Sequence, residues 1–551
     1  MNRGRSAFLL GTVFFSGAAV MVVEMTTVRA LQPTFGAENF VWTNVIAVVL
    51  AALAAGYAIG GRLADARPSP GVLYGVLAGG GLLVAAAAPL CTPVSQWLLP
   101  VDVNLENMTS FLMRGSLAAT LILFAPSTLL LGMVSPMAIR LLSDHGVGRA
   151  AGRVFAISTV GSIVGTYLPT LWLIDAYGSR ATLLIAAAML LVPAVAGLLV
   201  FSGLRGAPLA ALAIAAWAGT AAAAELSPNR GAPALEGGGT ALVREERESP
   251  YQYLTVREDT YPGQPPTTWK LLTINEGVFT YHSFEVAGSV LTGHRYYDDY
   301  ALLPLLLDVA PGEELRGAVV GLAGGVTPHQ WDHFWGQTYS LRIDGAELDP
   351  DVVALGRRYF HLPPADAAWL RVRVMDGRQM LAALPADASF HMLVVDAFSQ
   401  ECYIPFHLAT REFFELCRAR LTDGGVFAMN VYAYSADSEI LTAIENTLAT
   451  VFGRCQRVKQ KWGGNFLLLA RKGGEPADVT RFLESRARTR FGRRADVSEW
   501  DTLMGQASWI PEHTTLVAPD PMTRVLTDDH CPLEAMTERS FRRIEAEILG
   551  D

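Results

Sequence analysis

The sequence predicts an all-α polytopic membrane domain followed by an α/β, Rossmann-like domain that begins with a small β subdomain. The first 225 residues are rich in Ala, Leu, Val and Gly and poor in charge, whereas residues 241–551 have an ordinary globular composition. From Leu315 onward, predicted strands alternate with predicted helices, which favours a parallel, doubly wound sheet. An apolar strand at 318–320 also runs into a glycine-rich turn, and a second strand ends in an acid about twenty residues later.

We expect three parts: a transmembrane domain of about seven helices at 1–225, a linker with a β-hairpin subdomain and a connecting helix at 226–310, and the Rossmann-like domain at 311–551. The apolar stretches that could each cross a hydrocarbon core of about 30 Å are 7–28, 40–60, 71–91, 116–139, 152–174, 181–201 and 207–224. The first contains Glu24 and is followed by further stretches, so we interpret it as a span and not as a cleaved signal peptide. Two prolines in the fourth, Pro126 and Pro136, predict either a kinked helix or a packing face of small residues.

Arginines in the loops between these stretches indicate the orientation. Eight lie on the side of the N-terminus and three on the other, so we expect a multi-pass protein of the cell (inner) membrane with a cytoplasmic N-terminus. Seven spans would place the C-terminal part outside the cytoplasm, and six or eight would place it inside. Within the second stretch, the small residues of the run Gly56–Arg62 favour close helix packing over a substrate path.

Composition excludes several classes of protein. A net charge of -9 and an isoelectric point near 5.7 argue against a nucleic-acid partner, which would require a basic surface. Five scattered cysteines without a CxxC pair imply neither a zinc site nor a disulfide framework, and no metal is expected.

The C-terminal part has a clear order of predicted elements. After a linker at 226–240, short strands separated by turn residues predict a β-hairpin subdomain at 240–243, 251–257 and 269–274, followed by a helix at 296–307. Further strands are predicted at 317–321, 341–347, 371–375, 391–396, 425–431 and 465–470. Helices are predicted at 350–360, 377–384, 409–421 and 437–452.

Acidic residues stand where these strands end, which is where doubly wound sheets bind ligands. Glu347 can accept hydrogen bonds from both ribose hydroxyls, Asp376 can accept one from an adenine amino group, and Asp396 can act as a general base. Either of the first two could instead cap the helix that follows it. The backbone of a glycine loop completes the predicted nucleoside site, whose loop members are Gly321, Ala323, Gly324 and Gly325, with Gly377 beside Asp376.

Several motifs resemble the spermidine/spermine synthase family, the polyamine aminopropyltransferases, and in particular its membrane-fused branch. The matching stretches are Glu276-Gly-Val, Tyr296-Tyr-Asp-Asp-Tyr, Ala346-Glu-Leu-Asp-Pro, Met375-Asp-Gly-Arg, Val395-Asp-Ala-Phe-Ser, Pro405-Phe-His-Leu-Ala-Thr-Arg-Glu-Phe and Leu526-Thr-Asp-Asp-His-Cys-Pro-Leu-Glu. The resemblance implies a class I S-adenosylmethionine-type fold and a transferase of polyamine biosynthesis that moves an aminopropyl group from decarboxylated S-adenosylmethionine to an amine. It also implies that Asp396 is the base and that Tyr296 and Asp298 contact the amine.

The sequence departs from this family at two acids. The family's glycine loop usually carries an aspartate that binds the charged tail of the nucleoside, and this loop has none. The acid three residues after the base, which binds the distal amine, is Ser399 here. The loop without an acid is compatible with a first alternative, a methyltransferase-like enzyme that uses S-adenosylmethionine itself. The predicted topology, with the C-terminal part outside the cytoplasm, supports a second alternative, a non-catalytic sensor or transporter that binds a polyamine or nucleoside. Expected partners are a small-molecule amine or polyamine, the lipid bilayer and a second copy of the chain in a homodimer.

Overall fold

The computed structural model describes residues 3–540 apart from 37–38, 99–107, 144–145, 204–205, 227–234, 276–280, 386, 400–402, 434, 462, 493, 495 and 538. The chain divides into two compact units, residues 1–231 and 232–551, and each is described by itself. The Glu276-Gly-Val motif and most of the predicted linker lie outside the described residues.

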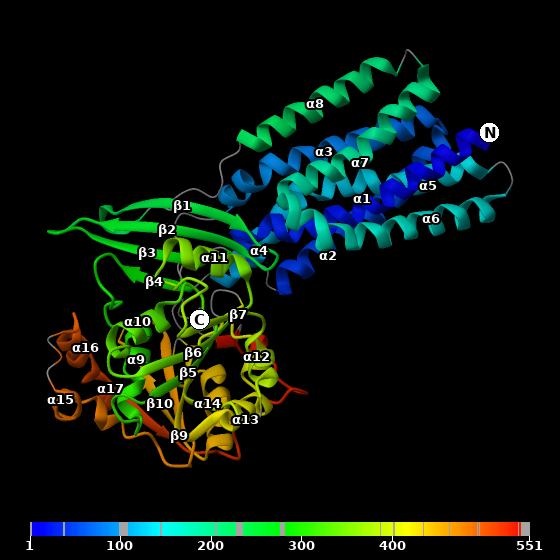
Figure 1. Cartoon of the computed structure of the whole chain (residues 1–551). Coiled ribbons are helices and arrows are strands. Elements are labelled where there is room, and N and C mark those ends of the chain that lie inside the picture. The colour runs from blue at the N-terminus through cyan, green and yellow to red at the C-terminus, as the bar shows by residue number, and fades with distance from the viewer. Residues whose placement is uncertain are drawn as a thin grey trace, which may run out of the picture. The chain divides into compact units, whose positions relative to one another are not determined.

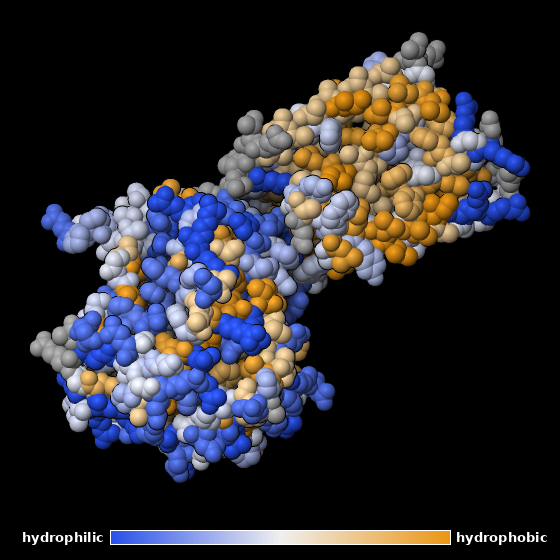
Figure 2. All heavy atoms as spheres, viewed as in Figure 1, coloured by the Kyte–Doolittle hydropathy of each residue, from blue (hydrophilic) through white to orange (hydrophobic). Residues whose placement is uncertain are grey.

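In the described residues of the first unit, every regular element is a helix (Figure 1). They are α1 (Arg3–Phe35), α2 (Asn39–Ala66), α3 (Pro70–Leu98), α4 (Met108–Leu123), α5 (Ala125–Leu142), α6 (Val147–Leu168), α7 (Ile174–Ser202) and α8 (Ala207–Leu226). Within the described residues, seven helices are long and apolar enough to cross a membrane, and hydrophobic side chains gather over the face of this unit seen in Figure 2. A break at Phe124 divides the fourth predicted stretch into α4 and α5, where the prolines predicted a kink.

Glycines let two of these helices pack with their backbones in contact. A Cβ atom added to Gly56 of α2 would lie 2.2 Å from the carbonyl oxygen of Leu129 and 3.0 Å from Cα of Gly132, both on α5. Contacts of this kind stabilise helix pairs in a bilayer, where the hydrophobic effect does not drive association. The segment that begins at Gly56 therefore packs against a neighbouring helix, as the sequence predicted.

The second unit begins with a four-stranded antiparallel sheet in the order β1–β2–β3–β4. Its strands are β1 (Thr240–Glu248), β2 (Tyr253–Tyr261), β3 (Thr267–Ile274) and β4 (Ser283–Val286). The first three correspond to the predicted hairpin subdomain, and β4 was not predicted. The connecting helix α9 (Tyr296–Ala301) ends earlier than predicted and continues as a 3-10 turn at Leu303–Leu306.

An eight-stranded sheet forms the centre of this unit, in the order β12–β10–β11–β9–β8–β5–β6–β7. Its strands are β5 (Glu314–Val320), β6 (Ser340–Glu347), β7 (Leu370–Val374), β8 (Phe390–Val395), β9 (Leu421–Tyr432), β10 (Cys455–Lys459), β11 (Asn465–Arg471) and β12 (Thr514–Val517). The helices between and after them are α10 (Val326–Trp335), α11 (Pro350–Tyr359), α12 (Gly377–Ala383), α13 (Arg411–Ala419), α14 (Glu439–Phe452), α15 (Glu484–Phe491), α16 (Trp500–Ala507) and α17 (Trp509–Glu512). The predicted α/β, Rossmann-like fold is confirmed.

One part of the sheet prediction is wrong. The strands β5 to β9 are parallel, but β11 pairs antiparallel with β9, and β10 pairs antiparallel with both β11 and β12. Only residues 460–464 separate β10 from β11, which is too short for the crossover that parallel neighbours need. The pattern from 465 to 470 was thus the second arm of a hairpin.

The sheet reverses its direction of growth at β5. From β5 the chain adds β6 and β7 on one side and then returns to place β8 and β9 on the other. Alternate residues of β5 face two hydrophobic cores, with Val319 in one and Val320 in the other, so helices cover both faces. The carboxyl ends of β5 and β8 consequently flank a crevice at the switch point, where such sheets bind ligands.

The packing of α2 on α5 generates a prediction. Gly56→Ala places a methyl group against the α5 backbone and should lower the melting temperature in detergent, because overpacking typically costs about 1–3 kcal/mol. Gly61→Ala on the same helix is the matched control, since a Cβ there meets nothing within 4 Å. Equal melting temperatures for the two variants would contradict the backbone contact.

Candidate functional site

The glycine loop after β5 forms one wall of a cavity of about 250 Å³. Gly321 has a φ of +85° and lies so close to β8 that an added Cβ would be 2.2 Å from the carbonyl oxygen of Asp396. Such a turn and such an approach need glycine. The residues that line the cavity are Gln252, Ile274, His282, Val320, Gly321, Ala323, Ala346, Glu347, Leu348, Val352, Met375, Asp376, Gly377, Asp396, Ala397, Phe398, Ser399, Pro405, His407 and Leu408.

Glu347, at the end of β6, is bound to the glycine loop. Its Oε2 accepts a hydrogen bond from the backbone N–H of Ala323 at 2.9 Å, and its Oε1 accepts one from the N–H of Asp349 at 3.1 Å. Burial raises the pKa of this carboxyl. The helix cap of α11 is Asp349, which accepts from the N–H of Asp351, so Glu347 is not the cap. Its carboxylate lies beside the glycine loop in the cavity wall, and its oxygens have lone pairs left to accept hydrogen bonds from a ligand.

Asp376, after β7, both caps a helix and lines the cavity. Its Oδ1 accepts from the N–H of Gln379 at 2.9 Å and so caps α12, while its Oδ2 lies 2.9 Å from Nε2 of His407. The hydrogen bond with His407 is the main reason why the pKa of this carboxyl is lowered. The adjacent Gly377 has no room for a side chain, because a Cβ would lie 2.2 Å from Cγ1 of Val320.

Asp396 follows β8 and faces the same cavity as Glu347. Burial raises the pKa of its carboxyl to about 7, and hydrogen bonds from Asn430 and Tyr296 partly oppose that rise. The Asn430 amide donates to Oδ1 at 3.1 Å, and the Asn465 amide donates to Asn430 in turn at 2.9 Å. A carboxyl that ionises near neutral pH and is held in one orientation is well suited to accept a proton.

Three further predicted residues lie in different settings. Tyr296 is buried and contacts Asp396, and Ser399 lines the cavity with its N–H and hydroxyl bound to the Tyr403 carbonyl at 2.8 Å and 3.2 Å. Among the described residues, neither Tyr296 nor Asp298 lines the cavity, and Tyr296, but not Asp298, forms a hydrogen bond with Asp396.

The Asp298 carboxylate is instead the centre of a buried hydrogen-bond network. It accepts from the N–H and hydroxyl of Thr292, the N–H of His294 and the amide of Gln330, all within 2.9 Å. Such a fully bound carboxylate holds α9 in place and has little capacity left for an amine. The next residue, Asp299, accepts from the Gln460 amide at 2.7 Å, and burial raises its pKa to about 7.

Sequence reasoning missed four polar residues that line or adjoin the cavity: Gln252, His282, His407 and Asn430. Asn430 could have been found, because it is a polar residue inside the apolar run of β9. His407 lies within a motif that was recognised, but nothing in its spacing indicates that it meets Asp376. His282 stands at the start of a strand that was not predicted at all.

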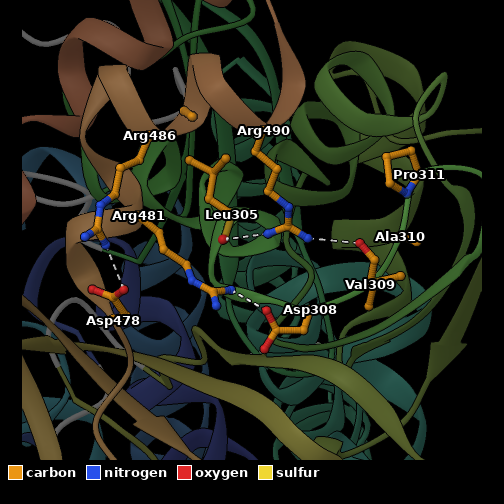
Figure 3. A pocket seen from close by; sticks show the side chains of 10 residues that line it. Leu305, Asp308, Val309, Ala310, Pro311, Asp478, Arg481, Arg486 and Arg490 are labelled. Atoms are coloured by element: carbon orange, nitrogen blue, oxygen red, sulfur yellow. Dashed lines mark hydrogen bonds and ion pairs between the residues drawn. The ribbon is translucent and has the colours of Figure 1, made fainter.

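A second cavity, of about 560 Å³, is lined by arginines (Figure 3). Arg481 binds Asp308 at 2.7 Å, and Arg486 binds Asp478 at 2.9 Å. Arg490 donates to the carbonyl oxygens of Leu305 and Val309 at 3.1 Å and 3.0 Å. Because these guanidinium groups are already bound to the protein, we interpret them as a brace that holds residues 305–310 against α15 and the turn before it.

Comparison with known proteins agrees with the motifs. No family model matches the chain. It is 27% identical over 316 residues to a probable polyamine aminopropyl transferase of Bifidobacterium longum, which covers 55% of this chain and 64% of that protein. It is also 27% identical over 244 residues to a polyamine aminopropyltransferase of Vibrio vulnificus, covering 43% of this chain and 75% of that one. The match thus spans less than two thirds of the Bifidobacterium protein.

Solved structures with a similar arrangement include a probable spermidine synthase from Corynebacterium glutamicum, with a TM-score of 0.37, 18% identity, and coverage of 52% of this chain and 96% of that one. Human methyltransferase-like protein 13 in complex with SAH gives a TM-score of 0.27 and 20% identity over 39% of this chain and 88% of that one. The chain is therefore similar in sequence to the polyamine aminopropyltransferases, and the resemblance inferred from its motifs is confirmed.

Proposed function

We propose that this protein is an integral-membrane enzyme that transfers an aminopropyl group from decarboxylated S-adenosylmethionine to a small amine or polyamine. The observation that carries the proposal is Asp396, a half-buried carboxyl at the end of β8 whose pKa is raised to about 7 by desolvation. It shares one cavity with the glycine loop and Glu347. The similarity to curated polyamine aminopropyltransferases supports the same reaction.

The nucleoside is held by the strand ends in this proposal. Glu347 accepts the ribose hydroxyls, and its two backbone hydrogen bonds fix its direction. The backbone of the loop 321–325 approaches the nucleoside closely, which its glycines permit. Asp376, oriented by His407, accepts from the adenine amino group beside Gly377.

The reaction is a displacement at carbon. An alkylammonium with a pKa near about 10 first loses a proton to the Asp396 carboxylate. The freed nitrogen lone pair then forms a bond to the methylene carbon next to the sulfonium. The carbon–sulfur bond breaks, its electron pair returns to sulfur, and neutral methylthioadenosine leaves. Asn430 and Tyr296 hold the base in place, and Ser399 lies where the acceptor's far end would reach.

A methyltransferase-like reaction with S-adenosylmethionine is the second candidate, and one feature of the loop favours it. Gly324 has no room for a side chain, because a Cβ there would lie 2.7 Å from Oγ of Ser283 and 3.0 Å from Cγ of Phe360. The loop therefore presents no carboxylate to a cationic nucleoside tail. Release of S-adenosylhomocysteine in place of methylthioadenosine would identify this alternative.

The ribose role of Glu347 can be tested by calorimetry. Glu347→Ala removes the hydrogen bonds from the ribose hydroxyls to a charged carboxylate, which together contribute roughly 1.5–3 kcal/mol to binding. The affinity for methylthioadenosine should therefore fall at least about tenfold. A folded variant with unchanged affinity would refute the nucleoside assignment.

The role of Asp396 can be tested by turnover. Asp396→Asn keeps the shape of the side chain and its contact with Asn430 but cannot take a proton, so turnover should fall by about 10²–10⁴-fold with methylthioadenosine binding nearly intact. Because only the ionised carboxyl acts as a base, wild-type turnover should also fall as the pH drops through about 7. Full turnover of a stable variant would contradict the mechanism.

Melting temperature is the control for a merely structural role of Asp396. An unfolded aspartate has a pKa of about 3.9. Between that value and about 7 the folded protein binds a proton that the unfolded chain does not, so wild-type stability declines as the pH rises through this window. Asparagine lacks this penalty, and Asp396→Asn should gain stability relative to the wild type from pH 4 to 7. A variant that is less stable at every pH would identify Asp396 as a structural cap.

We propose that the seven long apolar helices cross the membrane with the N-terminus in the cytoplasm, which places the catalytic unit outside. A phosphatase fused at residue 235 should then be active and a green fluorescent protein fused there should be dark. The reverse result would show that one of the seven helices does not cross the membrane. The first to examine would be α8, the alanine-rich last helix of the first unit.

A further inference from the structure

His282 is a half-buried polar residue of the cavity that the mechanism above does not use, and its Nε2 atom is buried. It lines the cavity, and its Nε2 has no hydrogen-bond partner among the described residues. Its ring meets Phe398, two residues beyond the base, edge to face at 6.4 Å and 80°. A buried nitrogen without a partner is uncommon because it has lost its hydrogen bonds to water. At the wall of a cavity, such a nitrogen indicates a ligand that completes it.

Neighbouring contacts place His282 between the glycine loop and the base. The next residue, Ser283, accepts a hydrogen bond at Oγ from the N–H of Gly324 at 2.6 Å. The carbonyl oxygen of His282 accepts from the hydroxyl of Tyr297 at 3.2 Å, and Tyr297 is the neighbour of the tyrosine that contacts Asp396. A nucleoside whose ribose lies on the loop would extend its sulfur and the chain attached to sulfur into this part of the cavity.

The loop itself, Gly321-Leu-Ala-Gly-Gly325, offers that chain no polar or charged side chain. Ser283 and Phe360 fill the space that a side chain at position 324 would need. Burial lowers the pKa of His282 to about 4, so at neutral pH the ring is uncharged and one of its nitrogens carries a lone pair. An uncharged imidazole can accept a hydrogen bond from an amino group. Unlike a carboxylate, it contributes no negative charge to that contact.

On the basis of the function proposed above, we propose that His282 determines donor specificity by binding the amino group on the sulfur-linked chain of the nucleoside. The ligand class is an adenosine thioether or sulfonium with an aminoalkyl chain. Its amino group satisfies the unpartnered Nε2, and the nucleoside part is bound independently by Glu347 and the loop.

Two nucleosides that differ only in this chain separate the contributions. Methylthioadenosine carries a methyl group on sulfur, and its thioether analogue carries a 3-aminopropyl group in the same place. His282→Ala should lower the affinity for the aminopropyl compound about tenfold, as expected for one hydrogen bond to a charged group, and change that for methylthioadenosine by less than about twofold. His282→Gln, which offers an amide near the position of Nε2, should recover part of the loss.

His329→Ala is the matched control. Burial lowers the pKa of His329 to about 4 as well, but this residue is not among those that line the cavity in the described part of the chain. It should leave both affinities unchanged. An equal loss of both nucleosides in His282→Ala, or no loss of either, would overturn the proposal while leaving the function intact. A wild-type protein that binds neither nucleoside would overturn the function itself, and this inference with it.

Discussion

The contact between the ends of β5 and β8 is the constraint on which the site depends. The N–H of Asp396 donates to the carbonyl of Val320 at 2.8 Å, and Gly321 turns away with its Cα against the backbone of Asp396. Any side chain at 321 would force the two strand ends apart. Because they stay together, the glycine loop and the candidate base share one small cavity. The reversal of strand order among the parallel strands of the sheet brings these two strand ends together at this point.

Three acids at successive strand ends acquire different chemistry from their surroundings. Asp376 has an imidazole beside it and its pKa is lowered. Glu347 and Asp396 are half-buried and desolvation raises the pKa of both carboxyls, although backbone N–H groups bind the first and side-chain donors bind the second. In the proposed function, carboxylates bind the nucleoside at two positions and accept a proton at a third. Their different solvent access and hydrogen-bond partners give them different pKa values, which would allow these separate roles.

Much of this arrangement could be predicted from the sequence, for identifiable reasons. The strand ends that carry Glu347, Asp376 and Asp396 follow short apolar runs, and the parallel order of the sheet brings those ends together. The antiparallel edge could not be predicted from hydrophobic pattern, because a buried strand looks alike in either direction and only the short connection before β11 distinguishes them.

The hydrogen-bond and ring partners of individual side chains could also not be predicted from the sequence. Adjacent acids in α9 have different surroundings. Asp298 accepts four hydrogen bonds, whereas Asp299 accepts one from Gln460, which directly follows β10. The ring of His282 contacts Phe398, and His407 forms a hydrogen bond with Asp376; both partners are distant in the sequence. Spacing along the chain carries no information about such contacts unless a motif records them.

In the proposed function, the protein transfers an aminopropyl group from the nucleoside to an amine within this cavity. The direct measurement is mass spectrometry of the products formed when the purified full-length protein is incubated with decarboxylated S-adenosylmethionine and a mixture of amines. We expect methylthioadenosine and an aminopropylated amine in equal amounts, and neither product with Asp396→Asn. Intact donor and unmodified amines after incubation with a protein that binds methylthioadenosine would contradict it.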